Sequence, residues 1–230
     1  MADRFEKSVF EYAGTIKPGE LVLVEYTSRE PVHLLLHKVL EYARLNGIAF
    51  VIVDVLDGLH VMRTHLMLAG VDASPIDSAP VIKIHGNVQT GTIIAKINGL
   101  AEFSILKRRF TEALKMAKEV MGGKPFSRII VGATEFLQQL ETEPMRREEF
   151  LAGIIRPMVG NPHTMGLVLI NRKRIGRATL GELEEMATRV LAVDVRDDKL
   201  IIRVTKSVHF GEYGMEVEFD SQTIGESYTK

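Results

Sequence analysis

The residues of this chain that could do chemistry gather at a few points, and the first is a turn between an apolar run and a series of leucines. The apolar run is Leu21 to Val24, and leucines at helical spacing follow from Leu34. A strand-turn-helix of this kind holds phosphate in nucleotide-binding α/β proteins, through glycine N–H groups, a lysine and a hydroxyl that reaches Mg²⁺. Here the turn has no glycine, and Val32 and His33 stand at the lysine and hydroxyl positions. The sequence therefore predicts the geometry of a phosphate loop without its chemistry.

Two further groups of residues could bind a metal ion or a ligand. His33 and His37 are spaced i, i+4 on the predicted helix, so that two imidazoles could share a metal ion, but no third ligand is adjacent. Asp54 and Asp57 follow the second apolar run, at the end of a strand where α/β proteins bind ligands. We favour packing or surface positions for the histidines and a turn-forming or helix-capping role for the aspartates, and no metal is predicted.

The strongest local charge is a basic stretch near the end of the chain. Residues 151 to 180 contain no acidic residue, and their basic side chains include Arg172, Lys173, Arg174 and Arg177. Clustered basic residues can bind a phosphate backbone without reading base sequence. No aromatic residue is interleaved with them to stack on single-stranded bases. Two interpretations remain open: contact with nucleic acid, or a solvated loop whose arginines pair with Glu182, Glu184 or Glu185.

Composition limits the class of protein. A chain of 230 residues with 46% hydrophobic content fits one large α/β domain or two small ones, and a net charge of -1 gives no general field for polyanions. The absence of Cys excludes disulfides and thiolate metal sites and suits a reducing compartment. The first residues do not resemble a signal peptide, and no apolar run reaches the roughly 20 residues of a membrane span. We expect a cytoplasmic protein, and low Asn and Gln usage is a feature of heat-adapted sources.

The elements that must position these residues alternate between strands and helices over most of the chain. Strands are predicted at 21–24, 48–53, 81–85, 92–97, 126–132, 166–170, 190–195, 199–204 and 215–219. Helices are predicted at 3–13, from 27 or 30 to 47, and at 59–69, 102–121, 133–141, 144–156 and 179–187, with 72–80 as a loop. The spacings Thr27-Glu30 and Thr179-Glu182 predict capping boxes.

The pattern of these elements predicts the fold class. Continuous apolar strands separated by helices predict a mostly parallel sheet covered on both faces. Strands 81–85 and 92–97 are predicted to form a hairpin, and the alternating final strands predict an antiparallel β-meander. We therefore expect a single α/β domain over residues 1–230, with the meander at its C-terminal end.

The lead-in from Gly14 to Glu25, together with this order of elements, resembles the RecA/KaiC-like ATPase core. In that superfamily a glycine, an apolar residue and a proline-glycine pair precede the strand that leads to the Walker A loop, and Gly14, Ile16, Pro18 and Gly19 match that pattern. The resemblance covers nearly the whole chain and implies the RecA-like fold. Within the superfamily the chain is most similar to a small archaeal family of unknown function whose phosphate loop is degraded.

The resemblance also implies where a nucleotide would bind, and the chain departs from the superfamily there. The degenerate phosphate-loop position comprises Tyr26, Thr27, Ser28, Arg29, Glu30, Pro31, Val32 and His33. Gly132 stands where the Walker B aspartate is expected, and of the paired acids after the second strand Asp54 is present while Val55 replaces the other. Positioning and charge stabilisation carry phosphoryl transfer, so these departures argue against ordinary ATP hydrolysis.

We therefore expect a non-catalytic protein of this fold, without a cofactor, that binds a protein or peptide partner or associates with itself. One alternative is a divergent ATP-binding protein or ATPase that uses Lys17, Arg29 or Lys206. The resemblance places Lys206 in a terminal segment that related ATPases direct at a neighbouring subunit's nucleotide. The other alternative is a nucleic-acid accessory protein that acts through the basic loop 171–177. No membrane partner is expected.

Overall fold

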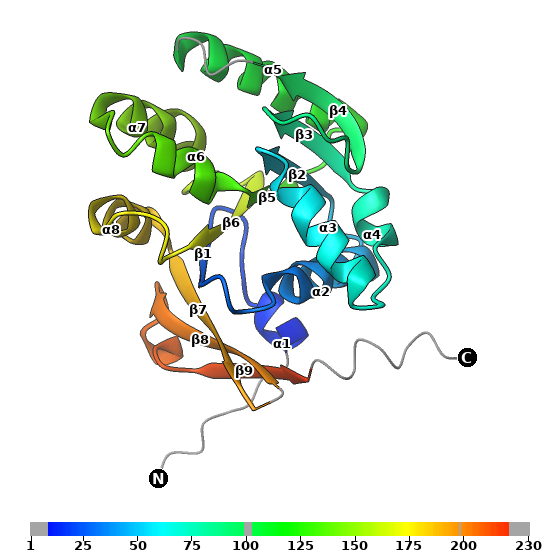
Figure 1. Ribbon diagram of the computed structural model, residues 1–230, viewed down its shortest axis with the longest axis vertical. Helices are drawn as coiled ribbons and strands as arrows, with labels where there is room; N and C mark the ends of the chain where they lie inside the picture. The colour runs from blue at the N-terminus through cyan, green and yellow to red at the C-terminus, as the bar shows by residue number, and fades with distance from the viewer. Residues whose placement is uncertain (1–8, 99–102, 198, 221–230) are drawn as a thin grey trace.

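Among residues 9–98, 103–197 and 199–220, which this computed structural model describes, nine strands form one sheet (Figure 1). Their order is β4-β3-β2-β5-β6-β1-β7-β8-β9. The strands are β1 Leu21–Tyr26, β2 Phe50–Val55, β3 Pro80–Ile84, β4 Thr92–Ile97, β5 Phe126–Val131, β6 Thr164–Asn171, β7 Arg189–Arg196, β8 Lys199–Ser207 and β9 Glu216–Asp220. The strands from β4 to β7 pair in parallel, and β7, β8 and β9 form the predicted antiparallel meander.

Helices pack on both faces of this sheet because its central strands are apolar on both sides. The helices are α1 Val9–Ala13, α2 Val32–Leu45, α3 Gly58–Leu68, α4 Ser74–Asp77, α5 Phe103–Val120, α6 Ala133–Gln139, α7 Pro144–Phe150 and α8 Arg177–Met186. The core on one face joins the sheet to α5, α6, α7 and α8, and the core on the other face joins it to α2, α3 and α4. The predicted mixed α/β architecture is therefore confirmed.

The predicted hairpin of the third and fourth strands is wrong, because β3 and β4 are parallel. The Thr92 N–H donates to the Ala79 carbonyl at 2.8 Å, so β4 starts beside the start of β3. The intervening residues 85–91 bring the chain back along the sheet, with His85, Gly86 and Gly91 at positive φ. The glycines at both ends of this segment gave the appearance of a hairpin turn, although they serve a return connection.

Several predicted helix boundaries also differ from the structure. The helix after β1 begins at Val32, later than either predicted start, and the predicted loop at 72–80 contains the short α4. The helix opened by Pro144 ends at Phe150 and continues as a π turn, Leu151–Ile155, and a 3₁₀ turn, Arg156–Met158. The capping box predicted at Thr179 is wrong, because α8 begins two residues earlier and Thr179 is buried inside it.

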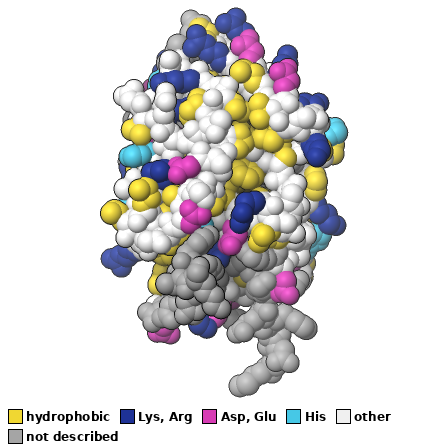
Figure 2. Space-filling view, turned by 90° about the vertical axis from the view of Figure 1, so that its right-hand side faces the viewer, with side chains coloured by type: hydrophobic (Ala, Val, Ile, Leu, Met, Phe, Trp, Pro, Cys, Tyr) yellow, Lys and Arg dark blue, Asp and Glu magenta, His cyan; other side chains and the backbone are white. Residues whose placement is uncertain are grey.

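One edge of the sheet is formed by β4, which pairs only with β3 among the described strands. In Figure 1, β3, β4 and α4 lie at the right of the molecule. Figure 2 turns this side toward the viewer and shows a band of hydrophobic side chains along the middle of that face. The register between β3 and β4 shifts between Val81 and Ile82. An irregularity of this kind makes an edge strand a poorer template for pairing with another chain.

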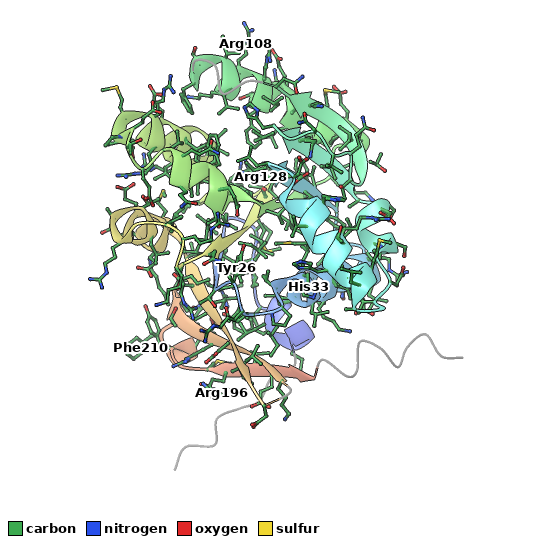
Figure 3. All side chains as sticks on the ribbon, viewed as in Figure 1. Tyr26, His33, Arg108, Arg128, Arg196 and Phe210 are labelled. Carbon is green, nitrogen blue, oxygen red and sulfur yellow. The ribbon has the colours of Figure 1, made fainter. Side chains whose placement is uncertain are left out.

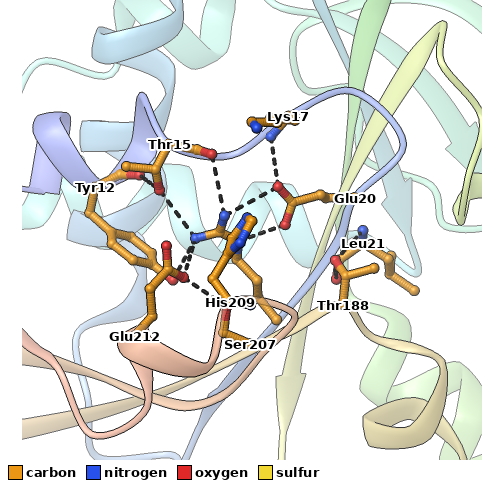
Figure 4. A network of polar contacts seen from close by, with 10 residues as sticks. Tyr12, Thr15, Lys17, Glu20, Leu21, Thr188, Ser207, His209 and Glu212 are labelled. Carbon is orange, nitrogen blue, oxygen red and sulfur yellow. Dashed lines mark hydrogen bonds and ion pairs between the residues drawn. The ribbon is translucent and has the colours of Figure 1, made fainter.

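A buried arginine joins the start of the chain to the meander (Figure 4). The Arg189 side chain is fully buried, and its guanidinium contacts Glu20 and Glu212 at 2.6 Å each. It also donates to the Tyr12 and Thr15 hydroxyls at 3.2 and 3.1 Å. These partners come from α1, from the turn before β1 and from the loop between β8 and β9. A buried cation with several charge-assisted bonds therefore holds the two ends of the described fold together.

None of the helices in the described part of the chain combines the length and the apolar character that a membrane crossing requires.

Candidate functional site

Four parallel strands end around a cleft of about 360 Å³. The strands are β1, β2, β5 and β6, and the turn that follows each of them contributes to the lining. Helices α2 and α3 close one side. In open α/β sheets ligands bind beyond the carboxyl ends of the strands, where neighbouring connections leave to opposite faces. The cleft is thus at the position where the resemblance placed a nucleotide.

The turn after β1 is closed by a carboxylate of its own. The Thr27 N–H and hydroxyl both donate to the Glu30 side chain, the hydroxyl at 3.0 Å. The capping box predicted here is wrong, because α2 begins only after Pro31, without a side-chain hydrogen bond at its N-cap, and the bonds between Thr27 and Glu30 close the turn ahead of the helix. In a phosphate loop such N–H groups are turned toward the ligand. Here Glu30 takes the Thr27 N–H, and its negative charge opposes a phosphate in the same place.

Val32, at the position of the Walker lysine, is buried in the core beneath the cleft. His33 lies at the cleft wall, where its ring meets that of His65 on α3, with 5.2 Å between the ring centroids. Burial, helped by His65, lowers the pKa of His33 to about 4, so the imidazole is neutral near pH 7. His37 is only 3% exposed. The structure thus brings His33 together with His65, a pairing that the sequence spacing did not indicate.

No group of three or more His, Cys, Asp or Glu side chains in the described part of the chain is arranged to hold a metal ion. His33 and His65 form a pair without a third ligand of this kind.

Asp54, the residual acid, is paired with a buried lysine on the neighbouring strand β3. The Lys83 ammonium on β3 lies 2.7 Å from the Asp54 carboxylate and 2.5 Å from that of Asp57. The other Asp54 oxygen accepts the Leu59 N–H at 2.9 Å, near the start of α3. Burial would lower the pKa of Lys83, but the hydrogen bonds to the two aspartates outweigh it and raise that pKa. Asp54 thus holds the start of α3 and the Lys83 ammonium, which is a structural role of the kind predicted for it. In the sequence, the single lysine inside the apolar run of β3 was the feature that could have indicated a buried acidic partner.

Gly132, which the resemblance places at the Walker B position, has no room for a side chain. Its φ is +76°, and a Cβ at this residue would lie 1.9 Å from the Val55 carbonyl oxygen. The neighbouring turn is equally close, since a Cβ on Gly58 would lie 2.7 Å from the Gly132 Cα. The turns after β2 and β5 therefore pack backbone against backbone at the floor of the cleft, and the space between them leaves no room for a side chain at Gly132.

The basic loop and the turn after β1 lie side by side. The Arg172 N–H donates to the Tyr26 carbonyl at 2.9 Å, and the Asn171 side chain donates to the Ser28 hydroxyl at 2.9 Å. Arg174 lines the cleft and pairs with Glu135 of α6 at 2.5 Å. The predicted phosphate-loop position and the basic stretch, far apart in sequence, thus form one rim.

Within the described residues, the structure does not show the ion pairs that the second interpretation of the basic loop, a solvated loop paired with α8, requires. The arginines of the loop do not pair with Glu182, Glu184 or Glu185 in the described residues, because Arg174 pairs with Glu135 and the Arg172 guanidinium donates to the Glu25 carbonyl at 3.3 Å. Lys173 is exposed, and Arg177 is the first residue of α8.

The two lysines proposed for an unusual ATP site lie away from the cleft. Lys17 precedes β1, so the whole strand separates it from the turn at Tyr26. The Lys206 ammonium donates to the carbonyls of Glu184 and Glu185, at 2.6 and 3.1 Å, and so caps the C-terminus of α8. The third residue named for that alternative, Arg29, is exposed in the turn after β1 and is not among the residues that line the cleft.

Glu25, one residue before the turn, is a buried carboxyl group. It is 6% exposed, and one of its oxygens has no hydrogen-bond partner in the described part of the protein. Burial and the neighbouring Glu184 raise the pKa of Glu25 to about 7, while Arg172 opposes the shift. The folded state therefore favours a protonated Glu25 under weakly acidic conditions.

We expect Glu25→Gln to reduce the loss of stability that accompanies rising pH. Because the folded pKa is above the ordinary value, the folded protein binds the proton more tightly, and stability falls between about pH 4.5 and pH 7. The expected loss from this group is on the order of 3 kcal/mol. Urea unfolding across that window should therefore show the variant and the natural protein diverging as the pH rises, with the variant more stable at the alkaline end. Parallel pH profiles would contradict the assignment.

Comparisons with known proteins agree with this fold. The protein PH0250 of Pyrococcus horikoshii OT3 has a structure that superposes with a TM-score of 0.76, at 22% identity over 92% of this chain and 98% of that one. The KaiC-like protein PH0186 of the same organism gives 0.59, at 14% identity over 90% and 88%. The uncharacterized protein PH0321, solved in complex with an unknown peptide, gives 0.61, at 15% identity over 94% and 100%.

At these identities the likeness establishes the fold, and the RecA/KaiC-like architecture inferred from the sequence is confirmed. A search of curated proteins found no match. A family model described as "Pyrococcus protein of unknown function, DUF257" matches residues 11–218. Since this match spans nearly the whole sequence, the chain is a member of the DUF257 family.

Proposed function

We propose that this protein is a non-catalytic binding module, which takes a segment of a protein or peptide partner into the cleft at the carboxyl ends of β1, β2, β5 and β6. One observation carries the proposal: the turn that would hold phosphate is closed by Glu30, yet a cleft of about 360 Å³ remains beside it. A cavity of this size suits a few side chains of a partner.

The lining of the cleft supports a peptide over a nucleotide. Val61 and Met62 of α3 provide an apolar wall, and His33 is a neutral group with both polar and apolar character. The solved structure of PH0321, which has the same fold, was obtained with an unknown peptide. That observation belongs to PH0321, and it makes a peptide the first ligand class to test here.

Thermal unfolding in the presence of Mg²⁺ and ATP tests the part of the proposal that says the cleft does not bind a nucleotide. We expect no saturable stabilisation, because the site lacks a lysine and Glu30 occupies the loop. A bound nucleotide at a hundred times its dissociation constant would add about 2.7 kcal/mol to the free energy of unfolding. A concentration-dependent shift of that order would therefore contradict the proposal.

A bulky side chain placed in the cleft tests the part of the proposal that says a peptide binds there. Val61 lines the cleft and is 52% exposed, so Val61→Trp should obstruct a ligand without disturbing the core. Val195 near the end of β7 is similarly exposed, at 43%, and Val195→Trp is the matched control. Peptides selected from a randomised dodecapeptide library should lose most of their affinity for the first variant and keep it for the second. Equal binding to both variants would place the peptide site elsewhere.

A further inference from the structure

The face of the sheet that α2, α3 and α4 cover is incompletely filled near the amino ends of its strands. Leu167 belongs to the central strand β6 and Phe50 begins β2, yet both side chains are only partly buried. Two spaces lie here, an inner chamber of about 80 Å³ and an outer chamber of about 190 Å³. They adjoin, because their linings share four residues, Ile16, Ile48, Ser127 and Met165. The cleft lies at the opposite, carboxyl end of the same strands.

The inner chamber is walled by hydrocarbon. Val22 and Ile129 line it from the sheet, and Val39 lines it from α2. Lys38 is the charged residue of its lining, and the Lys38 ammonium already pairs with Glu41 at 2.8 Å. An apolar cavity of about 150 Å³ can stay dry and take up benzene or xenon. The inner chamber together with part of the outer one is therefore of a size that suits a small apolar molecule.

One polar side chain is shared by both chambers. Ser127 is 9% exposed and lines each of them, on the same side of β5 as Ile129. The Ser127 N–H donates to the Ala49 carbonyl at 2.8 Å, whereas the Ser127 hydroxyl makes no hydrogen bond to another described residue. Buried polar groups are normally paired, and a buried water makes about three hydrogen bonds, more than one hydroxyl offers beside an apolar wall. The hydroxyl is thus available to a ligand.

We propose that the two chambers bind an uncharged small molecule with a short hydrocarbon chain and one polar oxygen, such as the hydroxyl of an alcohol or the carbonyl of a ketone. The chain packs on Val22, Val39 and Ile129 in the inner chamber, and the oxygen forms a hydrogen bond with the Ser127 hydroxyl. A carboxylate or an amine fits less well, because desolvating a charge beside hydrocarbon costs more than one hydrogen bond returns.

This site is separate from the peptide cleft, and the inference goes beyond the proposed function. Ligand pockets for larger molecules usually have volumes of about 300–1,000 Å³. The inner chamber is much smaller, which argues against a peptide segment as its occupant.

Titration of the natural protein with 1-hexanol, followed by methyl NMR, locates the ligand. We expect saturable shifts at Val22, Ile129 and Leu167, which line the inner chamber. Val61 and Met62, which line the cleft, should not shift. Hexanoate should bind roughly tenfold more weakly at pH 7, because its charge has to be desolvated. Unsaturable shifts, shifts centred on Val61 and Met62, or equal affinity for hexanoate would overturn the inference.

Removing the hydroxyl tests the role of Ser127. Ser127→Ala should weaken 1-hexanol about threefold to tenfold, the effect of one net hydrogen bond. n-Hexane, supplied from a saturated solution, has no oxygen and should bind the variant as well as the natural protein. Ser104→Ala on an exposed position of α5 is the matched control and should bind both ligands normally. Unchanged affinity of Ser127→Ala for 1-hexanol would refute the hydrogen bond.

Filling the inner chamber tests the site independently. Val39→Phe should abolish 1-hexanol binding and keep or raise the melting temperature, since it fills empty space. Val120→Phe, at an exposed position of α5, is the matched control and should leave binding unchanged. Leu167→Phe fills the chamber from the sheet, so the test stands even if the first variant does not fold. Binding that survives both fillings would overturn the inference. A natural dimer that Val39→Phe dissociates would assign the chambers to an interface between copies instead.

Discussion

Replacing Gly132 with aspartate is expected to unfold the protein or to destabilise it by more than about 4 kcal/mol, rather than to restore a magnesium site. A Cβ at this residue would lie 1.9 Å from the Val55 carbonyl oxygen, a distance that requires the turns after β2 and β5 to separate. The positive φ adds strain of about 1–2 kcal/mol for any residue with a side chain. Urea unfolding of Gly132→Ala measures the steric part without the added charge.

A second glycine provides the control for the backbone conformation. Gly122 has a φ of +62°, and a Cβ there would meet nothing within 4 Å. Gly122→Ala should therefore cost only the strain, about 1 kcal/mol, and the difference between the two alanine variants isolates the contact with Val55. If both variants lose the same stability, the close packing of the two turns is not what excludes a side chain at Gly132.

Replacing Arg189 with leucine is expected to cost about 3–5 kcal/mol of stability, because it leaves two buried or half-buried carboxylates without their cation. Glu20 and Glu212 each lie 2.6 Å from the guanidinium, which is fully buried. The matched control is Arg196→Leu on the same strand. Arg196 also holds a glutamate through two bonds, at 2.9 and 3.0 Å to Glu216, but it is exposed (Figure 3) and should cost less than about 1 kcal/mol.

Two further measurements separate the charge effect at Arg189 from lost packing. Arg189→Leu combined with Glu20→Gln should recover part of the loss, since the unpaired carboxylate is then neutral. Burial would raise the pKa of Glu20, but Arg189 and the Lys17 N–H lower it, so its contribution to stability is lost as pH falls below the ordinary range of a glutamate. Arg189→Leu should therefore reduce the fall in the free energy of unfolding that the natural protein shows as the pH is lowered. If the dependence of stability on acidic pH is unchanged and the double variant regains no stability, the ionic interpretation is refuted.

The parts of the fold that follow from local patterns could be predicted from the sequence. Continuous apolar runs identified the central strands, and alternation identified the meander, because burial on two faces and on one face leave different periodicities. The direction of β4 could not be obtained in this way. A glycine at each end of a short segment is compatible with a hairpin and with a return connection, and only the contact of Thr92 with Ala79 distinguishes them.

The candidate site was predictable in outline but not in its internal contacts. The missing lysine at Val32 and the missing acid at Gly132 are visible in the sequence, since they are substitutions within an expected pattern. Lys83 was missed because its partners Asp54 and Asp57 are on another strand and turn. Arg189 was missed for the same reason, since its acidic partners are 169 and 23 residues away along the chain. Pairings of this kind depend on strand order, which a single sequence does not specify.

The close packing of the turns after β2 and β5 limits which substitutions this end of the sheet can accept. A lysine introduced at Val32 would place its stem in the buried core while Glu30 still holds the Thr27 N–H, and an aspartate at Gly132 would collide with Val55. Each step toward a nucleotide site thus meets a neighbour that has to change as well, so a single substitution is not expected to create nucleotide binding here. Divergence within the family is then expected to proceed by altering the rim and walls of the cleft, while the turns beneath them stay the same.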